Sequence, residues 1–396
     1  MVEVSSLPGG GRVYRPIGMP RGHAGSFAVA VEHGRIARID NVSAQPAHSI
    51  MLPPLADLHV HASRAFSIGE VLPASLEQAI EMSVTTFMNH RAADYARHAE
   101  RLFAAAFRHG TTRIRTHADV SQHIRLDAVT GTLLAAARFS AALDVEVVAF
   151  AASDVDPVDP EARALLRDAM GQGARLLGAA LDYYRDTRAS IDALLDLAVE
   201  TGAPLDVHLD EHLDAERSAS GHLAAATIAR GLGGTVTLSH GCAIGVLDDV
   251  RRQRVIEQLA RAGVTVIALP STNLFLQDRG TGSPSRRGLA PARQLLAAGV
   301  PVRLASDNVR DAFFPYGKAD LIEIAQLGAV AGHLDDPRQI VAAICAGREQ
   351  VRVGDEASFV LVPGAVFAEL LCAPAEGRVI VRDGVLLDCH ATAMPR

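Results

Sequence analysis

The sequence has few of the features that mark membrane, secreted or nucleic-acid-binding proteins. Although 49% of its residues are hydrophobic, it contains no run of about 18 apolar residues that could span a membrane. Its N-terminus has no apolar stretch typical of a secretion signal. No CxxC spacing occurs among its four cysteines, Cys242, Cys345, Cys372 and Cys389. Because the formal net charge is −7, a nucleic-acid surface is not expected either. We therefore expect a cytoplasmic chain with free thiols and with no membrane or nucleic-acid partner.

Two histidines stand at the end of a short β-type segment, Leu55–His61. In this segment apolar residues alternate with Asp57, His59 and His61. Residues two apart in a strand point to the same side, so both imidazoles can face one point beyond the strand. Two neutral imidazoles aimed at one point are typical of a divalent metal site, although two polar residues at a loop mouth would give the same short pattern.

Later segments repeat this arrangement, each with a polar residue at the end of a β-type run. These residues are His117, His208, His240 and Asp307. Stretches of helical length and helical apolar spacing lie between the runs, which is the pattern of alternating β and α units around a parallel sheet. We count eight units, with strands expected at Leu55–His61, Arg113–His117, Val145–Phe150, Arg175–Ala180, Leu205–His208, Thr235–His240, Thr265–Leu269 and Val302–Ser306.

Eight βα units predict an α/β fold of the (β/α)8 barrel type, in which chemistry gathers at the carboxyl ends of the strands. Glycines such as Gly202 and Gly263 follow the expected helices, where a left-handed cap residue is typical. The helices illustrating this pattern are expected at Leu126–Leu143, Ser190–Thr201, Asp248–Ala262 and Ala290–Ala298. All six of the polar strand-end residues would then lie at one end of the barrel.

The two ends of the chain are expected to meet in a second, smaller domain. Phe27–Ile39 and Arg378–Leu387 both read as β-hairpins that turn at a residue followed by glycine. Neither end makes a sufficient sheet alone. We therefore expect a small β-sandwich built from residues 1–52 and 351–396, beside a barrel that spans residues 53–350.

The ordered set of HxH, THxDV, HxxE, SH and SD motifs resembles the amidohydrolase superfamily, and within it the cytosine-deaminase-like branch. The segments that carry the resemblance are Thr116–Val120, Asp206–Glu211, Asn273–Gln277, Arg286–Gly288 and Ser306–Asn308. The resemblance covers nearly the whole chain and implies hydrolysis at a carbon that bears an exocyclic amine. It also implies a single Zn²⁺ or Fe²⁺ ion, whose ligands would be His59, His61, His208 and Asp307.

Lysine is almost absent, which bears on the number of metal ions. Binuclear relatives bridge two metals with a carboxylated lysine at the end of the fourth strand. In this chain the fourth strand ends at Gly178-Ala179-Ala180, and the single lysine, Lys318, lies beyond the eighth strand. We therefore predict one divalent metal ion per chain, with a site bridged by some other group as the less favoured alternative.

Three residues are expected to carry the chemistry beside the metal, which would activate a water molecule as hydroxide. Asp307 can take the proton of that water, and His240 can hold the water by a hydrogen bond. Glu211 lies three residues after His208, where it can protonate a ring nitrogen and later the departing amine. The alternative for Glu211 is a solvated carboxylate in a loop.

The substrate is predicted from departures from the cytosine deaminase pattern. Ala152 stands where that enzyme carries a glutamine that reads the pyrimidine amide edge. Arg64 follows the HxH motif and can clamp a carboxylate or an oxyanion. Asn308 replaces a second aspartate, as in the relatives that remove alkylamines from s-triazines. The other residues expected at the substrate are Asp182, Phe313 and His117. His117 could instead support the metal ligands from behind.

These observations predict a metal-dependent hydrolytic deaminase that acts on an amino-substituted N-heterocycle other than cytosine. One alternative is a cyclic amidase that opens a lactam or imide ring, and a release of ammonia would separate the two. The other alternative is a barrel that binds a small molecule without catalysis. The expected partner is a small-molecule substrate, and assembly into a homo-oligomer is left open.

Overall fold

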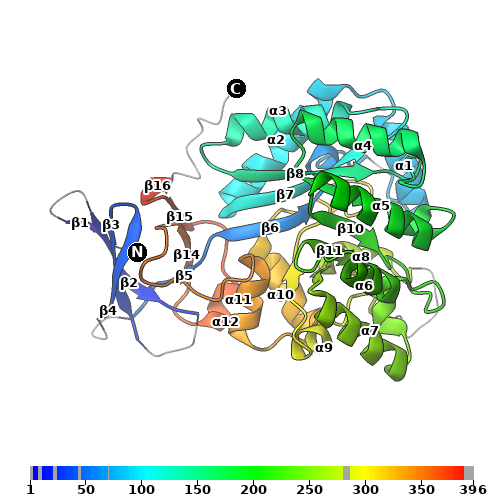
Figure 1. Cartoon of the computed structure of the whole chain (residues 1–396). Coiled ribbons are helices and arrows are strands. Elements are labelled where there is room, and N and C mark those ends of the chain that lie inside the picture. The colour runs from blue at the N-terminus through cyan, green and yellow to red at the C-terminus, as the bar shows by residue number, and fades with distance from the viewer. Residues whose placement is uncertain are drawn as a thin grey trace.

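Eight parallel strands form the main body of the protein (Figure 1). The computed structural model describes residues 3–7, 11–20, 25–42, 46–69, 71–279 and 286–387. In sequence order around the barrel the strands are β6 (Leu55–Val60), β7 (Thr111–Val120), β8 (Asp144–Ala151), β9 (Leu176–Ala179), β10 (Leu205–Leu209), β11 (Val236–His240), β12 (Thr265–Ala268) and β13 (Val302–Leu304). Every expected strand overlaps an observed one, and the predicted (β/α)8 barrel is confirmed.

The barrel closes between its first and last strands at the residues predicted to bind metal. Val60 forms a parallel bridge with Asp307. The backbone N–H of His61 donates to the carbonyl of Asp307 at 3.0 Å, and the N–H of Asp307 donates to the carbonyl of His59 at 2.9 Å. Backbone hydrogen bonds at the closure therefore fix the relative positions of three predicted ligands.

Helices cover the outside of the barrel, so the parallel strands are buried on both faces (Figure 1). They are α2 (Ala92–Arg108), α3 (Asp127–Phe139), α4 (Pro160–Gln172), α5 (Thr187–Thr201), α6 (Ser220–Ala229), α7 (Asp249–Ala262), α8 (Pro270–Leu276), α9 (Ala292–Ala297), α10 (Leu321–Gly332) and α11 (Pro337–Ile344). Helix α7 shows why they start and stop where they do. The side chain of Asp248 accepts a hydrogen bond from the N–H of Arg251, and Gly263, with φ of 62°, ends the helix in the left-handed conformation.

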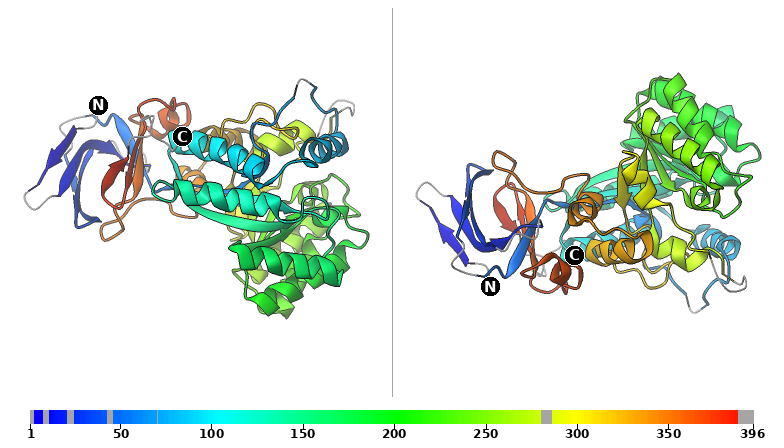
Figure 2. Two further views of the ribbon diagram at one scale, coloured as in Figure 1. Left: turned by 90° about the horizontal axis from the view of Figure 1, so that it is seen from above. Right: turned by 90° about the horizontal axis from the view of Figure 1, so that it is seen from below.

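Strands from both ends of the chain build a separate β-domain at one end of the barrel (Figures 1 and 2). The strands are β1 (Glu3–Ser6), β2 (Arg12–Gly18), β3 (Phe27–Glu32), β4 (Arg35–Asn41), β5 (Ser49–Leu52), β14 (Phe359–Pro363), β15 (Val379–Arg382) and β16 (Val385–Leu387), with the short helix α12 (Phe367–Leu371) after β14. They form one continuous sheet in which β5 joins the N-terminal to the C-terminal strands. The rings of Tyr14 and Phe359 meet edge to face at 5.3 Å in the core of this domain.

One helix of the barrel was not expected from the sequence. Helix α1 (Leu76–Phe87) lies between β6 and α2, at the end of the barrel opposite the small domain (Figures 1 and 2). The side chain of Ser75 caps it by accepting a hydrogen bond from the N–H of Gln78. Because the strands point away from the small domain, α1 stands at their carboxyl ends, where the predicted site residues are.

The described cysteines form no disulfide. Cys242 and Cys345 are buried, Cys372 is exposed, and all three are free. Cys389 lies outside the described residues. In the part of the chain that the structure describes, no helix combines the length and the apolar character needed to cross a membrane.

Candidate active site

The four predicted metal ligands meet at the carboxyl end of the barrel. The Nε2 atom of His208 lies 3.1 Å from Nε2 of His59 and 3.2 Å from Nε2 of His61. Oδ1 of Asp307 lies 3.6 Å from Nε2 of His59 and 3.5 Å from Nε2 of His61. With metal–ligand bonds of about 2.1 Å, tetrahedral coordination separates the ligand atoms by about 3.4 Å. The four atoms therefore surround a space that fits one metal ion.

The chemical state of these side chains also suits a cation. All four are buried, and burial lowers the pKa of the His59 imidazole to about 4, which favours the neutral form that binds metals. Burial, assisted by the nearby Asp311, raises the pKa of Asp307 to about 8. Among the described residues, Oδ2 of Asp307 has no hydrogen-bond partner. A divalent cation at this point would keep the carboxylate ionised and would satisfy the ring nitrogens.

We expect the purified protein to contain about one tightly bound divalent metal ion per chain. Lys318 cannot bridge a second metal, because its ammonium pairs with Glu323 at 2.9 Å and its side chain is 65% exposed. A second group of potential ligands, around Asp182 and Asp210, already accepts hydrogen bonds from the surrounding loop. Elemental analysis of an active preparation measures the number of metal ions per chain, and two equivalents of metal would contradict a mononuclear site.

A buried carboxylate that the sequence analysis did not single out supports the first histidine. Oδ1 of Asp206, on β10, lies 3.5 Å from Nδ1 of His59 and 3.5 Å from Nε2 of His117. Asp206 also accepts hydrogen bonds from Ser239 at 2.7 Å and from Arg115 at 3.1 Å. An imidazole that binds a metal through Nε2 commonly donates its other N–H to such a carboxylate, which fixes the ring and its tautomer.

Replacement of Asp206 by asparagine is expected to weaken metal binding by about ten- to a hundredfold while the chain still folds. The amide keeps the size of the side chain but loses the charge that orients His59. Competition with a chelator measures the affinity. Asp335→Asn is a matched control, because Asp335 is exposed and has no partner among the described residues. Equal affinities in the two variants would mean that Asp206 does not hold the metal site.

Glu211 is held over the cluster through its backbone. Its N–H donates to Oδ2 of Asp182 at 2.7 Å, and its carbonyl accepts a hydrogen bond from Gln277 at 2.8 Å. The preceding residue, Asp210, has φ of 58°, in the left-handed region that few non-glycine residues adopt. Burial, assisted by the charges of Asp307 and Asp182, raises the pKa of Glu211 well above its usual range. Burial therefore favours the protonated acid, which is the form that a general acid requires.

His240 lies beside Glu211 at the end of β11. Its Nδ1 atom is 3.5 Å from Oε1 of Glu211 and 3.0 Å from the side-chain nitrogen of Asn273. The other ring nitrogen, Nε2, is buried and has no hydrogen-bond partner among the described residues. With φ of 76°, the backbone of His240 is also left-handed. This orientation leaves Nε2 available to an oxygen atom placed next to the cluster.

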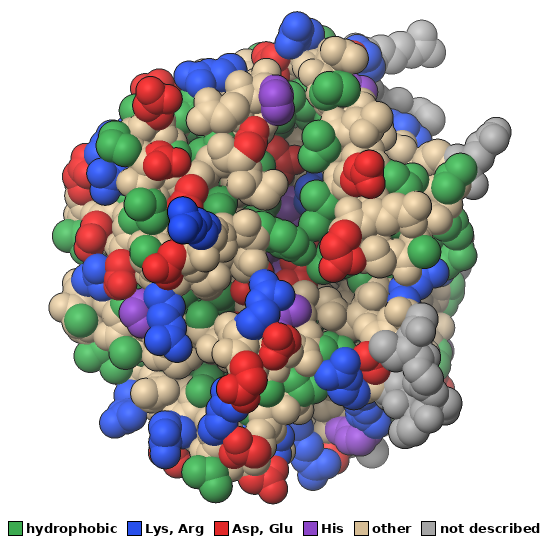
Figure 3. Space-filling model, turned by 90° about the vertical axis from the view of Figure 1, so that its right-hand side faces the viewer, with side chains coloured by type: hydrophobic (Ala, Val, Ile, Leu, Met, Phe, Trp, Pro, Cys, Tyr) green, Lys and Arg blue, Asp and Glu red, His purple; other side chains and the backbone are tan. Residues whose placement is uncertain are grey.

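A cavity of about 280 Å³ leads from the cluster to the surface. Figure 3 looks onto this face of the molecule, where a histidine side chain is visible inside a hollow. The aromatic rings of Phe150, Tyr183 and Phe313 line the cavity, and helix α1 adds an apolar wall that includes Ile80 and Phe87. The cavity is therefore largely apolar, and His61, His208, Glu211, His240 and Asp307 are among its lining residues.

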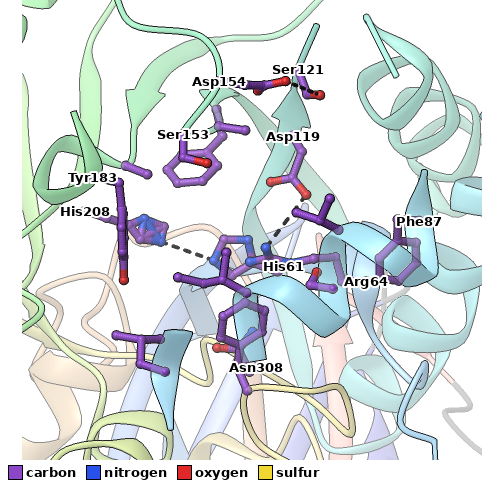
Figure 4. Close-up of a pocket in the computed structure, with 18 of the residues that line it drawn as sticks. His61, Arg64, Phe87, Asp119, Ser121, Ser153, Asp154, Tyr183, His208 and Asn308 are labelled. Carbon is purple, nitrogen blue, oxygen red and sulfur yellow. Dashed lines mark hydrogen bonds and ion pairs between the residues drawn. The ribbon is translucent and has the colours of Figure 1, made fainter. Parts of the chain in front are cut away.

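Four of the six predicted substrate residues line this cavity, namely Arg64, Ala152, Asn308 and Phe313. Arg64 is nearly buried, and its guanidinium lies 4.8 Å from the centre of the Phe313 ring. Its closest acid is Asp119, at 3.7 Å, and Figure 4 shows the two side chains directed toward each other. Because Arg64 also lines the cavity, its guanidinium is placed to donate to an acceptor on a substrate.

The other two predicted substrate residues do not line the cavity. His117 is fully buried, with its ring 4.0 Å from that of His59, so it supports the metal ligands. Asp182 lies under the Glu211 loop. Two parts of the cavity were missed, the wall formed by α1 and the partner of Arg64. Asp119 could have been found, because it follows His117 by two residues and strand alternation places both on one face.

Comparisons with known proteins agree with this site. The profile of the Amidohydrolase family matches residues 65–342. The chain is 34% identical over 313 residues to a pterin deaminase of Rhizobium rhizogenes, which covers 76% of this chain and 71% of the relative. It is 27% identical over 367 residues to an N-isopropylammelide isopropyl amidohydrolase of Pseudomonas sp., covering 86% of this chain and 88% of the relative.

A solved structure shows the same architecture. The structure of 5-methylcytosine deaminase from Klebsiella pneumoniae, liganded with phosphonocytosine, matches with a TM-score of 0.84 and 25% identity over 94% of this chain and 97% of the other. The match to the family profile spans most of the barrel and includes four of the five strands that end in predicted site residues. The resemblance found in the motifs is thus confirmed, and the chain belongs to the amidohydrolase family.

Proposed function

We propose that this protein removes an exocyclic amine from a fused two-ring heterocycle of the pterin class and uses one Zn²⁺ or Fe²⁺ ion. The chain is a metal-dependent hydrolase that acts on carbon–nitrogen bonds, as its family and relatives indicate. The observation that carries the finer proposal is the 34% identity to a pterin deaminase, taken together with a largely apolar cavity lined by aromatic side chains.

The side chains at the base of the cavity have complementary tasks. A metal ion held by His59, His61, His208 and Asp307 would supply a Lewis acid that makes water a nucleophile near neutral pH. Glu211, whose protonated form is favoured by burial, can donate its proton to the ring nitrogen beside the carbon that bears the amine. Asp307 can accept a proton from the attacking water, and His240 can hold the oxygen of that water. The departing amine takes a proton and leaves as ammonia, while the carbon keeps the oxygen.

The walls of the cavity support a bicyclic amino-lactam as the substrate. Phe150, Tyr183 and Phe313 line the cavity, and aromatic side chains pack favourably against flat rings. Ala152 presents no amide that could read a pyrimidine edge and leaves space for a second ring. Arg64 provides hydrogen-bond donors for an acceptor atom such as a lactam oxygen, and Asp119 beside it can accept from an N–H.

An ammonia-release assay with zinc- and iron-loaded protein tests this proposal. The panel contains pterin, guanine and cytosine, each of which carries a primary exocyclic amine that would leave as ammonia. We expect kcat/KM for pterin to exceed that for cytosine by about a hundredfold, because a site built for other hydrogen-bonding groups leaves its own buried groups unpaired with the wrong ring. Equal activity on cytosine would contradict the proposed class. Consumption of a substrate without ammonia would indicate ring opening by a cyclic amidase.

Replacement of Arg64 by methionine is expected to raise KM for the true substrate about tenfold and to leave kcat within a few-fold. Methionine keeps much of the packing on Phe313 but loses the charged donors, and a hydrogen bond to a charged group typically contributes about this much. Arg101→Met is the matched control, because its guanidinium also lies 4.8 Å from an aromatic ring, that of Phe66, but outside the cavity. An unchanged KM in the Arg64 variant would remove Arg64 from substrate binding.

A further inference from the structure

A second cavity, of about 230 Å³, lies at the amino ends of the strands and shares no lining residue with the first. This end of the barrel faces the small domain, because β6 follows β5 after two residues. Arg113, Arg115 and Arg303 line the cavity together with three threonines, Thr235, Thr237 and Thr265. Thr235 is exposed, so the cavity is open to solvent at that point.

Three arginines inside a barrel depart from the usual composition of this fold. The interior of a (β/α)8 barrel is normally filled by branched apolar side chains. Strand β7 instead carries Arg113, Arg115, His117 and Asp119 at every second position, which places them on one face. The arginines reach the second cavity, His117 packs on the metal ligand His59, and Asp119 reaches the first cavity.

The carboxylates near this cavity pair with Arg115 and Arg113 but not with Arg303. Arg115 donates to Glu146 at 3.3 Å and to Asp206 at 3.1 Å. Arg113 donates to the same Glu146 at 3.1 Å, and its Nε atom, which makes no hydrogen bond among the described residues, lies 4.0 Å from a carboxylate oxygen of Asp144. Both guanidinium groups of β7 therefore have carboxylates beside them.

The positive charge of Arg303 is less balanced by carboxylates than the charges of Arg113 and Arg115. No carboxylate of the described residues lies within ion-pair distance of it, and its side chain donates to the carbonyl of Val302 at 2.8 Å. Burial lowers the pKa of the guanidinium, which reflects a charge that is partly removed from water without an opposite charge beside it. The guanidinium of Arg303 packs closely against Gly347, where a Cβ atom would lie 2.5 Å from one of its nitrogens.

We propose that this cavity binds a small oxyanion, either a carboxylate or a phosphate, between Arg113 and Arg303. Guanidinium groups bind the oxygens of both ions through paired hydrogen bonds, and the hydroxyl of Thr237, which accepts from Arg115 at 3.4 Å, can donate to a remaining oxygen. The volume is much larger than one water molecule requires. Because the cavity is only about 230 Å³, the ligand is a small ion or metabolite and not a macromolecular surface.

Isothermal titration of the metal-loaded full-length protein tests the proposal, with inorganic phosphate in one arm and succinate in the other. Chloride keeps the ionic strength constant. We expect one saturable site per chain for at least one of the two ions. The ion with the lower Kd shows whether the site prefers a phosphate or a carboxylate. Arg303→Gln is expected to weaken that binding by about tenfold or more. Arg254→Gln, at an exposed position on α7 without a partner among the described residues, should leave Kd unchanged.

Two results would overturn the proposal. One is the absence of saturable binding in both arms. The other is a Kd that neither Arg303→Gln nor Arg113→Gln changes, since the ion would then be bound elsewhere, for example at the metal cluster. If a variant does not fold, the melting temperature of the wild-type protein still decides. It should rise in the binding ion relative to chloride at equal ionic strength, and an equal melting temperature would count against the site.

Discussion

Replacement of Asp307 by asparagine is expected to lower kcat by about a thousandfold or more while the chain still folds. The carboxylate has two tasks, as a metal ligand and as the acceptor of the water proton, and a neutral amide performs both poorly. Folding should survive, because Asp307 closes the barrel through its backbone, by hydrogen bonds to His59 and His61 that asparagine retains. Asparagine also tolerates the φ of 58° at this position.

The experiment compares kcat, metal content and melting temperature of Asp307→Asn with those of Asp335→Asn. The control removes an exposed carboxylate and should leave all three quantities unchanged. If Asp307→Asn retains wild-type turnover when it is fully loaded with metal, another residue accepts the proton. If it fails to fold, the barrel closure depends on the charge of Asp307 as well as on its backbone.

Glu211→Gln is expected to keep the metal and to lose at least about a hundredfold in kcat, the usual contribution of a general acid–base group. Glutamine preserves the backbone hydrogen bonds to Asp182 and Gln277 but cannot transfer a proton to a ring nitrogen. Glu376→Gln, at an exposed position without a partner among the described residues, is the matched control. Loss of metal together with a small loss of rate would instead make Glu211 a structural support of the cluster.

The pH dependence of kcat, compared between the wild-type protein and Glu211→Gln, provides a second readout. Donation by Glu211 requires its protonated form, and burial raises the pKa of this group well above that of a surface glutamate. The active form is therefore present below the raised pKa and is lost as the pH rises through it, so kcat of the wild-type protein should fall on the basic side. The residual activity of Glu211→Gln should lack that fall. If kcat fell at the same basic pH in both proteins, the fall would reflect the titration of another group.

The metal cluster could be predicted from the sequence because a parallel barrel brings the ends of all its strands to the same edge. Residues that end the strands of a parallel barrel meet at one edge whatever the length of the helices between them. The motif around His59 and His61 therefore sufficed, once eight units had been counted, to bring His208, His240 and Asp307 to the same place. The glycines after the helices located the ends of those units.

The supporting contacts could not be predicted in the same way, because they join side chains of strands that are distant in sequence. Asp206 contacts His59 from β10 and Arg115 from β7, and nothing in its own segment indicates these partners. Helix α1 has an apolar side that resembles ordinary core packing, so its role as a wall of the cavity depends on where the loop after β6 places it. The surplus charge around Arg303 likewise emerges only when the distances to all neighbouring acids are known.

The most direct test of the proposed reaction is the mass of the product formed from pterin in water enriched in heavy oxygen. The metal-loaded protein should release ammonia, and the product should carry one heavy oxygen atom in place of the exocyclic nitrogen. A product that keeps the nitrogen and gains the elements of water would show ring opening, and the absence of conversion by fully loaded protein would show that pterin is not the substrate. Either result would contradict deamination of a pterin-class ring at the cluster of His59, His61, His208 and Asp307.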